Sequence, residues 1–548
     1  MGDGVKLAWP HLLDGRQAWW PWVVVASLLF LCAAHGLWVV RGLTYPPDVD
    51  SLRDIGFVQS ILDGDLFGDA VSIGEVRWYP PLMPALTAII SRLLGISDLP
   101  AFLIEAAPWI NLLVPAAFFM AARQLLASSA SAAMALAAFV LLDGAVGWPW
   151  VTGGYTPWPL TPLITESLFF LTLWLILARQ NSHRWLDAAL VGAAIGVTFL
   201  AHPVPAIILT FIVTALAFGV RGFKVKTISW LAFVAVVQLA VMSPYLAPIA
   251  LHYPRGIVHS KPASWTDSMM SPYVGLMART ALLNAPGVLA LAGAVFLHRR
   301  GIRLRRGAVI ALGTWIILCS AFLVRHYACS VGARLVSADI ADVSVCRVFL
   351  MPVHHFHLYL QSAWAVLIGF VSWHVSRLLL QRSPRIRTRV ALTVALALAA
   401  AGGWSMLTRK FDSEQRAEAL EADGGFDIDL DAYHWILANT QPNDTFATPL
   451  LHEARDPAAF AVYAAARKLV AAPMLHSNPY VLWGPKEAQR RRILQAALGG
   501  GPATPLCESA SGRLWVLLPI DAAVDKSRVE SVYSSGNYTV YRVRGGVC

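Results

Sequence analysis

Hydrophobic runs of about 20 residues recur between residues 20 and 407, and they constrain this chain more than any other feature. About 20 apolar residues is the length that an α-helix needs to cross the hydrocarbon core of a bilayer. The composition agrees, because 57% of the 548 residues are hydrophobic and only 14% are charged. Such a balance is more apolar than that of soluble domains. The sequence therefore predicts a polytopic α-helical membrane protein.

After residue 407 the composition becomes that of an ordinary globular domain. Helical patterns at 413–422, 430–439, 457–467 and 486–498 alternate with the strand-like stretches "GRLWVLLP" and "YTVYRV". The "SSGN" before Tyr538 is typical of a turn and favours a closing hairpin. We therefore expect two domains, a transmembrane module at 1–407 and a soluble mixed α/β domain at 408–548.

The arginines indicate how the membrane module is oriented. Two short loops, 299–306 and 377–389, hold five arginines each, and loops rich in arginine usually face the cytoplasm. Successive spans cross the membrane in opposite directions. If 178–184 and 221–226 also face the cytoplasm, the chain crosses about eleven times. The count requires that 80–94 lies at the membrane interface instead of crossing. The expected spans are 20–40, 101–120, 128–142, 160–177, 185–201, 203–220, 228–249, 274–297, 308–324, 353–372 and 390–407.

This threading places the first outer loop, residues 41–79, on the same outer side as the C-terminal domain. We expect a multi-pass protein of a bacterial inner membrane with an uncleaved first span and an extracytoplasmic tail. The net charge of +10 is explained by the cytoplasmic loops, so nucleic acid is not an expected partner. Four cysteines fall outside, where Cys329 with Cys346 and Cys507 with Cys548 would be the local disulfides, although free thiols fit equally well.

The first outer loop opens with the acidic motif "PPDVD", in which Pro46 and Pro47 restrain the chain before Asp48 and Asp50. A carboxylate at the mouth of a span can accept a proton from a hydroxyl or an amine, which is the role of a general base. The same two carboxylates could hold a divalent cation such as Mg²⁺ or Mn²⁺. Alternatively, they are solvated or cap the helix that starts near Ser51.

The stretches "PPDVDSLRDIGFVQSILDGDLF" and "GEVRWYPPLMPALTAIISRLLG", residues 46–95, resemble the first outer loop of the GT-C superfamily of membrane glycosyltransferases. Protein mannosyltransferases and aminoarabinose transferases of this superfamily have an acidic motif after the first span, an amphipathic interface helix, a Gly-Asp pair and a Pro-Pro-Leu. The corresponding elements here are Pro47-Asp48-Val49-Asp50, the helix at 51–62, Gly64-Asp65 and Tyr79-Pro80-Pro81-Leu82.

The resemblance implies a GT-C-like fold and transfer of a sugar from a polyprenyl-phosphate or polyprenyl-diphosphate carrier, with inversion at the anomeric carbon. It also implies that an acidic residue activates the acceptor, which is a glycan, a lipid or a protein. The mannosyltransferase type has adjacent acids, whereas this chain has Asp-Val-Asp. We therefore predict Asp48, the first acid after the prolines, as the base and Asp50 as a helper.

A departing phosphate needs cations, and arginine suits it because its fork binds two phosphate oxygens. Arg347 is the first candidate, because it lies at the membrane edge in the expected topology. Its alternative roles are a snorkelling anchor or a partner of Asp339 or Asp342. The other candidates are Arg325, Arg334, His354 and His357, of which the two histidines could instead ligate a metal or join helices.

Five residues are further candidate substrate contacts. Ionisable residues within membrane spans are costly unless they face a cavity or a partner. Aromatic and basic outer-loop residues could stack on a sugar, clamp a diphosphate or meet lipid headgroups. The candidates are Tyr79, Glu166, His202, Arg255 and Lys261.

Two functions from other classes compete with the transferase. A transporter or flippase of a lipid-linked or anionic solute would use the same outer cations as a binding site, but it should have related halves, and none is evident. A non-catalytic subunit of a cell-envelope assembly complex would not need Asp48. No P-loop, dinucleotide fingerprint or G-x-S-x-G elbow occurs, so soluble nucleotide-sugar chemistry is disfavoured.

Overall fold

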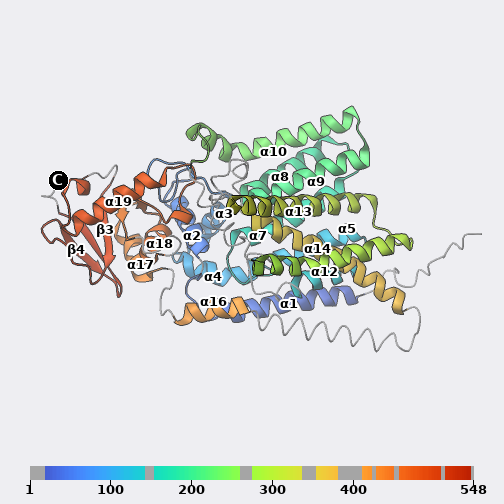
Figure 1. Cartoon of the computed structure of the whole chain (residues 1–548), viewed down its shortest axis with the longest axis horizontal. Coiled ribbons are helices and arrows are strands. Elements are labelled where there is room, and N and C mark those ends of the chain that lie inside the picture. Colours follow the sequence, from blue (N-terminus) through green and yellow to red (C-terminus); the bar gives the residue numbers. More distant parts are fainter. Residues whose placement is uncertain are drawn as a thin grey trace, which may run out of the picture.

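The computed structural model describes residues 19–47, 49–141, 154–258, 274–335, 353–380, 410–421, 428–449, 456–507 and 512–544. A bundle of long helices forms one end of the molecule and a sheet with its helices forms the other (Figure 1). The bundle contains α1 (Trp20–Val40), α4 (Leu99–Ile110), α5 (Leu113–Leu126), α6 (Ser129–Leu141), α7 (Thr161–Arg179), α8 (Trp185–Ala201), α9 (Pro203–Arg221), α10 (Val225–His252), α12 (Val274–Arg299), α13 (Arg306–Leu335) and α14 (Val353–Leu380). The predicted fold class, a polytopic helical protein with a mixed α/β tail, is confirmed.

Within the described residues, six helical segments are long and apolar enough to cross a membrane: Trp20–Val40, Leu99–Leu126, Pro203–Arg221, Val225–His252, Arg306–Cys329 and His355–Leu378. The expected span at 390–407 lies outside the described residues. The count of eleven crossings therefore stays a prediction.

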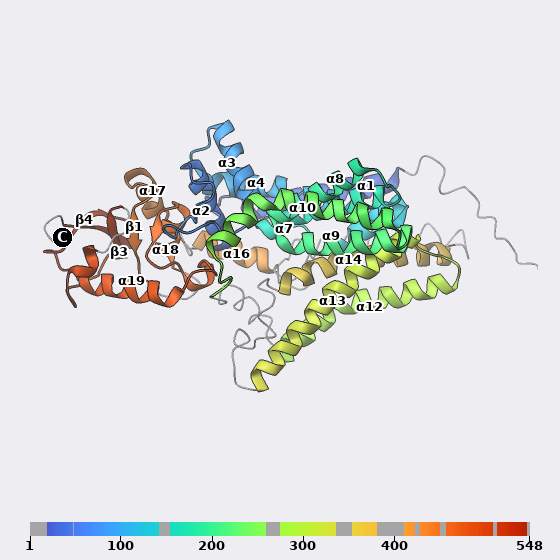
Figure 2. The same cartoon turned by 90° about the horizontal axis from the view of Figure 1, so that it is seen from above.

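Helix α3 (Leu82–Leu94) begins after two prolines and ends at Gly95, whose φ of 68° is the left-handed conformation of a helix C-cap. Its apolar side chains at positions 86, 89, 90, 93 and 94 are exposed, and this spacing forms one face of a helix. The helix projects from the side of the molecule (Figure 2). Both features favour the predicted position at the membrane interface.

The tail contains α16 (Lys410–Glu421), α17 (Leu430–Asn439), α18 (Pro457–Ala464) and α19 (Trp483–Ala497). Its strands β1 (Thr445–Ala447), β2 (Lys468–Leu469), β3 (Leu514–Pro519), β4 (Val529–Ser534) and β5 (Tyr538–Val543) form a mixed sheet in the order β2-β1-β3-β5-β4. The antiparallel β4–β5 pair is the hairpin expected from "SSGN".

The central strand β3 is buried on both faces, and its side chains alternate between two cores. Val516 and Leu518 pack with α19, whereas Trp515 and Leu517 pack in the cluster that contains α17 and α18. That second cluster also contains Leu52 and other residues of α2 (Val49–Leu62), the helix of the first outer loop. The loop and the tail therefore share one hydrophobic core.

Gly56 allows α2 and α18 to approach closely. A Cβ atom at this position would lie 2.2 Å from the carbonyl oxygen of Tyr463 and 2.9 Å from its ring carbon Cδ1. Both distances are shorter than a van der Waals contact, so a side chain at Gly56 would push the two helices apart.

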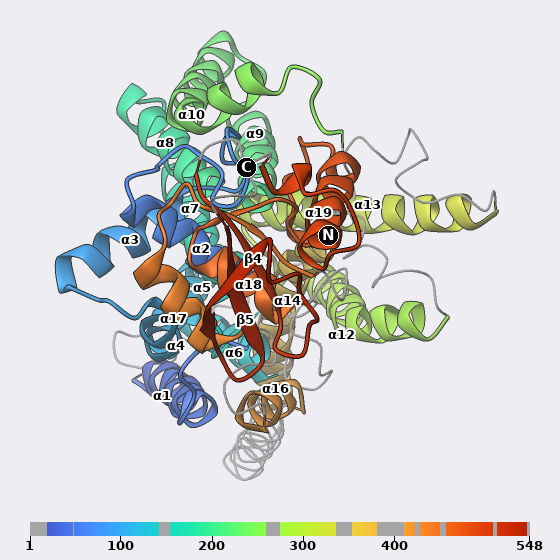
Figure 3. The same cartoon turned by 90° about the vertical axis from the view of Figure 1, so that its left-hand side faces the viewer.

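A second set of polar contacts holds α16, at the start of the tail, against α1. α16 lies next to the C-terminal end of α1 (Figures 1 and 3). Its Asp412 accepts hydrogen bonds from Trp158 Nε1 at 3.0 Å and pairs with His35 Nε2 at 2.9 Å, and Arg416 donates to the carbonyl oxygen of Val39. α16 is therefore held against the end of α1.

Two of the four cysteines that were expected on the outer side, Cys329 and Cys507, are disulfide-bonded. Their predicted partners, Cys346 and Cys548, lie outside the described residues. Cys32 and Cys319, which lie within helices of the bundle, are buried and form no disulfide within the described part of the chain. The alternative of free thiols therefore does not hold for Cys329 and Cys507.

Candidate functional site

The acidic motif leads directly into α2. Asp48 lies outside the described residues, and the helix begins at the next residue, Val49. Asp50 lies in the first turn, where a carboxylate interacts favourably with the helix dipole. Its Oδ1 accepts a hydrogen bond from Arg53 Nη1 at 2.7 Å. The candidate helper carboxylate is therefore already held by a cation one turn further along the helix.

Arg53 is the centre of a buried polar cluster. Its Nε and Nη2 donate to Asp54 Oδ1 at 3.0 and 2.8 Å, and its guanidinium lies 4.1 Å from the centre of the Tyr79 ring. Burial opposes the charged form, but the carboxylates of Asp50 and Asp54 outweigh it and hold the pKa of Arg53 well above its ordinary value. Arg53 therefore remains charged.

Tyr79, a predicted substrate contact, has its ring between Arg53 and the core. The ring stacks on Phe57 of α2 with centroids 5.4 Å apart and an interplanar angle of 5°. Tyr79 thereby fixes the position of the Arg53 guanidinium on one side.

Asp54 connects this cluster to the membrane bundle. Its Oδ2 accepts a hydrogen bond of 2.5 Å from the hydroxyl of Thr161, the first residue of α7. Burial raises the pKa of Asp54, and Arg53 and the Thr161 hydroxyl oppose this shift. The start of α2 is therefore anchored at the N-terminal end of a bundle helix.

The tail adds His476, a residue that the sequence analysis did not identify. It ends the short 3₁₀ helix Met474–His476, and its Nδ1 lies 3.6 Å from Asp50 Oδ1. The imidazole is buried and packs edge-on against Phe460, with ring centroids 5.3 Å apart. Burial lowers the pKa of His476 to about 4, so the ring is neutral at pH 7.

Two bundle histidines lie near the same cluster. His202 precedes α9, where its Nδ1 accepts a hydrogen bond from the backbone of Val204 at 3.3 Å. The His355 ring of α14 lies edge-on to it at 4.5 Å, and His355 is within electrostatic range of Arg53. Of the predicted bundle contacts, His202 is thus brought toward α2.

Two other predicted residues make contacts between bundle helices. His357 Nε2 lies 3.1 Å from Asn284 Nδ2 of α12 and 3.1 Å from Gln361 Nε2. Glu166 of α7 is buried, and its Oε1 accepts a hydrogen bond of 3.4 Å from Ser362 of α14. These contacts would explain both residues by helix packing, and their predicted roles in substrate binding stay untested.

The structure describes only some of the basic residues that were predicted to bind phosphate or substrate. Arg325 is half-buried in α13, a helix that with α12 leans away from the rest of the bundle (Figures 2 and 3). Arg255 is exposed in the loop after α10. Arg347 and Lys261, and the side chains of Arg334 and His354, lie outside the described residues.

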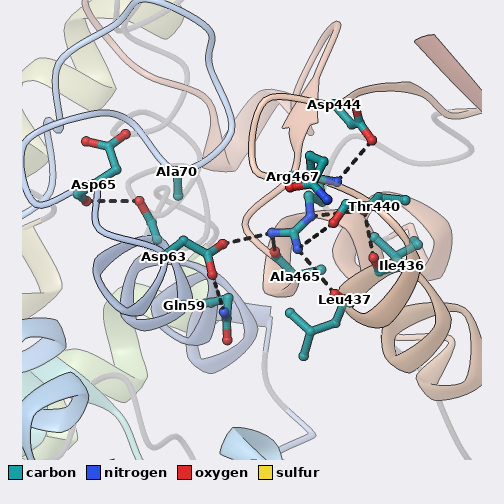
Figure 4. A network of polar contacts seen from close by, with 12 residues as sticks. Gln59, Asp63, Asp65, Ala70, Ile436, Leu437, Thr440, Asp444, Ala465 and Arg467 are labelled. Carbon is teal, nitrogen blue, oxygen red and sulfur yellow. Dashed lines mark hydrogen bonds and ion pairs between the residues drawn. The ribbon is translucent and has the colours of Figure 1, made fainter. Parts of the chain in front are cut away.

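The far end of α2 meets the tail through a second ion pair. Arg467 donates from Nη1 to Asp63 Oδ2 at 2.8 Å, and Gln59 donates to the other oxygen of Asp63 (Figure 4). The remaining Arg467 donors reach Thr440 and the carbonyl oxygens of Leu437 and Ala465. All five guanidinium N–H groups of this buried arginine are therefore used.

A third polar contact involves the loop, the tail and the end of α10. Asp69 is buried and accepts a hydrogen bond from Asn478 at 3.0 Å, and Asn478 also donates to the Tyr253 hydroxyl at 3.0 Å. That hydroxyl donates to Glu75 Oε2 at 3.0 Å. Together with Arg467, these bonds fix the tail against the bundle.

No group of three or more histidine, cysteine, aspartate or glutamate residues within the described part of the chain could hold a metal ion. The predicted cation site at Asp48 and Asp50 includes a residue outside that part, so it stays a prediction.

The structure is similar to two solved proteins over most of its length. ArnT from Cupriavidus metallidurans, an aminoarabinose transferase solved with undecaprenyl phosphate, matches with a TM-score of 0.56 at 14% identity, over 97% of this chain and 99% of that chain. The Archaeoglobus fulgidus oligosaccharyltransferase, tethered to an acceptor peptide, matches with a TM-score of 0.57 at 13% identity, over 92% and 70% of the two chains. This chain has the GT-C fold. No protein-family model matches it, and no curated protein sequence is significantly similar. The predicted GT-C resemblance is therefore confirmed at the level of the fold.

Proposed function

We propose that this GT-C chain is an integral-membrane glycosyltransferase that moves a sugar from a polyprenyl-phosphate donor to an acceptor on the outer face of the membrane. The observation that carries the proposal is the acidic start of α2, which the Arg53 cluster joins to the bundle and which faces His476 of the tail. The fold shared with ArnT, which binds undecaprenyl phosphate, supports the class of donor.

Asp48 is the proposed general base and Asp50 the helper. Asp50 is ion-paired with Arg53 at 2.7 Å, so one of its carboxylate oxygens is already engaged. Asp48 precedes α2 by one residue and would take the acceptor's proton as the acceptor oxygen or nitrogen bonds to the anomeric carbon. The bond from that carbon to the phosphate breaks, and the phosphate leaves with the electron pair.

Arg347 is the proposed phosphate-binding cation, with Arg325, Arg334, His354 and His357 as further candidates. A cation near the departing phosphate stabilises the charge that develops in the transition state. If Asp48 and Asp50 also hold Mg²⁺ or Mn²⁺, activity should be lost on chelation and restored by either ion.

The outer location of the tail is supported by two disulfide-bonded cysteines, Cys329 near the end of α13 and Cys507 in the tail. Disulfides persist in oxidising compartments. Cys32 and Cys319 form no disulfide among the described residues and lie within bundle helices, so they are compatible with this orientation. We place the site and the tail on the extracytoplasmic side of a bacterial inner membrane.

The test is single-turnover consumption of radiolabelled polyprenyl-phosphate sugars by purified full-length protein. Wild type is compared with Asp48→Asn and with the control Asp98→Asn. Asp98 caps α4, and asparagine caps a helix equally well. We expect wild type to consume at least one donor, Asp48→Asn to be about a hundredfold slower or more, and the control to match wild type.

A full rate in Asp48→Asn would remove Asp48 as the base and make Asp50 the next residue to test. If wild type binds undecaprenyl phosphate but consumes none of the donors, the transporter or the assembly-subunit function replaces the transferase.

A further inference from the structure

His476 differs from Asp50, Arg53 and Asp54 of the α2 cluster, whose side chains all have hydrogen-bond partners. Its residue is 5% exposed, yet neither Nδ1 nor Nε2 has a hydrogen-bond partner in the described part of the protein. Leaving a buried polar group without a partner costs about 1–3 kcal/mol. Beside a candidate reaction site, such a group is available to a partner that arrives from outside.

The geometry assigns different roles to the two ring nitrogens. Nδ1 is the nitrogen near Asp50, at 3.6 Å from its Oδ1, which is slightly beyond hydrogen-bond distance. A small movement would let Nδ1–H donate to the carboxylate. In a neutral imidazole only one nitrogen carries a proton, so Nε2 would then be an acceptor.

The groups around the ring keep the imidazole in that neutral form. α2 contributes the charges of Asp50 and Arg53, and α18 contributes the apolar ring of Phe460 and the hydroxyl of Tyr463, which donates to the backbone oxygen of His476 at 3.5 Å. Burial lowers the pKa of His476 more than Asp50 raises it. A neutral Nε2 can accept a hydrogen bond from a ligand.

We propose that His476 binds the sugar acceptor, with Nδ1–H directed to Asp50 and Nε2 accepting a hydrogen bond from the acceptor's nucleophilic hydroxyl or amine. This inference rests on the proposed transferase function and adds the tail's contribution to it. The tail thereby supplies a side chain to the reaction site, and the acceptor is held near the carboxylates at the start of α2.

The charged side chains near His476 restrict the chemical class of the acceptor. Asp50 and Asp54 place two carboxylates against the single guanidinium of Arg53 in the described cluster. An anionic nucleophile such as a carboxylate would be repelled there, whereas a neutral hydroxyl or an amine would not. His476 orients the nucleophile and keeps its own proton, so the acceptor's proton still passes to the general base.

The experiment measures donor consumption with water as the acceptor, and again with octyl glucoside, octylamine or octanoate added. The full-length variants are His476→Leu, His476→Gln and the control His434→Leu, which alters an exposed histidine of the same tail. Glutamine keeps both a donor and an acceptor, whereas leucine keeps neither. Thermal unfolding and undecaprenyl phosphate binding are measured for every protein.

We expect His476→Leu to consume the donor about a hundredfold more slowly, His476→Gln to stay within about tenfold of wild type, and His434→Leu to match it. Leucine should leave thermal stability unchanged or higher at pH 7.5, because it removes two polar atoms that lack partners. Octyl glucoside or octylamine should accelerate consumption by wild type, whereas octanoate should not.

Three results would overturn the inference. An unchanged rate in His476→Leu would show that the acceptor does not need this residue. A parallel loss of rate and thermal stability in that variant would give His476 a structural role. Wild type that consumes no donor would instead refute the transferase function, and the inference with it.

Discussion

At the C-terminal end of α2, Asp63 pairs with Arg467 of the tail, and all five N–H groups of that arginine have hydrogen-bond partners. At the N-terminal end, Asp50 faces His476 of the tail, and neither ring nitrogen of that histidine has a hydrogen-bond partner in the described structure. Both ends of one helix thus bury polar groups against the same domain. In the described part of the chain, the ring nitrogens of His476 leave bonding capacity for a ligand at the Asp50 end.

The difference separates a structural ion pair from a candidate reaction site. A buried charge that is fully hydrogen-bonded fixes the relative position of two elements and has nothing left to offer a substrate. A buried imidazole without partners, beside a carboxylate, reduces stability unless something else needs it. We therefore assign docking of the tail to Asp63 and Arg467, and chemistry to the opposite end of α2.

The largest loss of stability should come from breaking the ion pair between Asp63 and Arg467 at the C-terminal end of α2. Arg467→Met removes the guanidinium and leaves Asp63 and three carbonyl oxygens without their donor. Breaking a buried ion pair by removing one partner costs about 3–5 kcal/mol. Thermal unfolding and protease susceptibility of the tail should report the loss, with the exposed Arg492→Met as the unchanged control. Equal stability of both variants would show that Arg467 does not hold the tail.

Acid should reduce the stability of the protein through His476, at the N-terminal end of α2. The pKa of His476 is lowered from its ordinary 6.5 to about 4, so between these values the unfolded protein binds a proton that the native protein does not. Stability is therefore full above pH 6.5 and falls as the pH drops toward 4, by at most about 3 kcal/mol.

The pH effect is measured as the unfolding midpoint of wild type and His476→Leu from pH 7.5 to 4.5. The leucine variant should lose less stability over this range. Burial raises the pKa of Asp54 and Asp69, so these carboxyls act in the opposite direction, and their contribution is common to both proteins. Identical pH dependence in the two proteins would contradict the assignment to His476.

A substitution in the middle of α2 should have a smaller effect on stability. Gly56→Ala places a Cβ atom 2.2 Å from the Tyr463 carbonyl oxygen, and overpacking of this kind costs about 1–3 kcal/mol. Gly313→Ala in α13, where a Cβ meets nothing within 4 Å, is the matched control and should be neutral or slightly stabilising. If Gly56→Ala unfolds at the wild-type temperature, α2 and α18 are not packed as described.

Much of the fold follows from local sequence patterns. The length of the apolar runs predicted the bundle, and helical periodicity predicted α17 at 430–439 with its observed bounds. The helix near Ser51 in the first outer loop was also expected and is α2. These features depend on neighbouring residues, which is why a single sequence reveals them.

The pairing of distant segments could not be predicted in the same way. Arg53 lies one turn after Asp50, and that spacing was a signal for an ion pair on one helix face. His476 had no such signal, because only the packing of α18 against α2 brings it to Asp50. Nor did the sequence indicate that Asp63 and Arg467 would meet.

The two ends of α2 are best tested by comparing Asp48→Asn with Asp63→Asn, with donor consumption and thermal unfolding measured on the same purified proteins. We expect Asp48→Asn to keep wild-type stability and to lose about a hundredfold or more in rate. We expect Asp63→Asn to lose about 2 kcal/mol of stability and to stay within about threefold of the wild-type rate. The reverse pattern, an active Asp48→Asn beside an inactive but stable Asp63→Asn, would contradict the assignment of chemistry to the N-terminal end of α2.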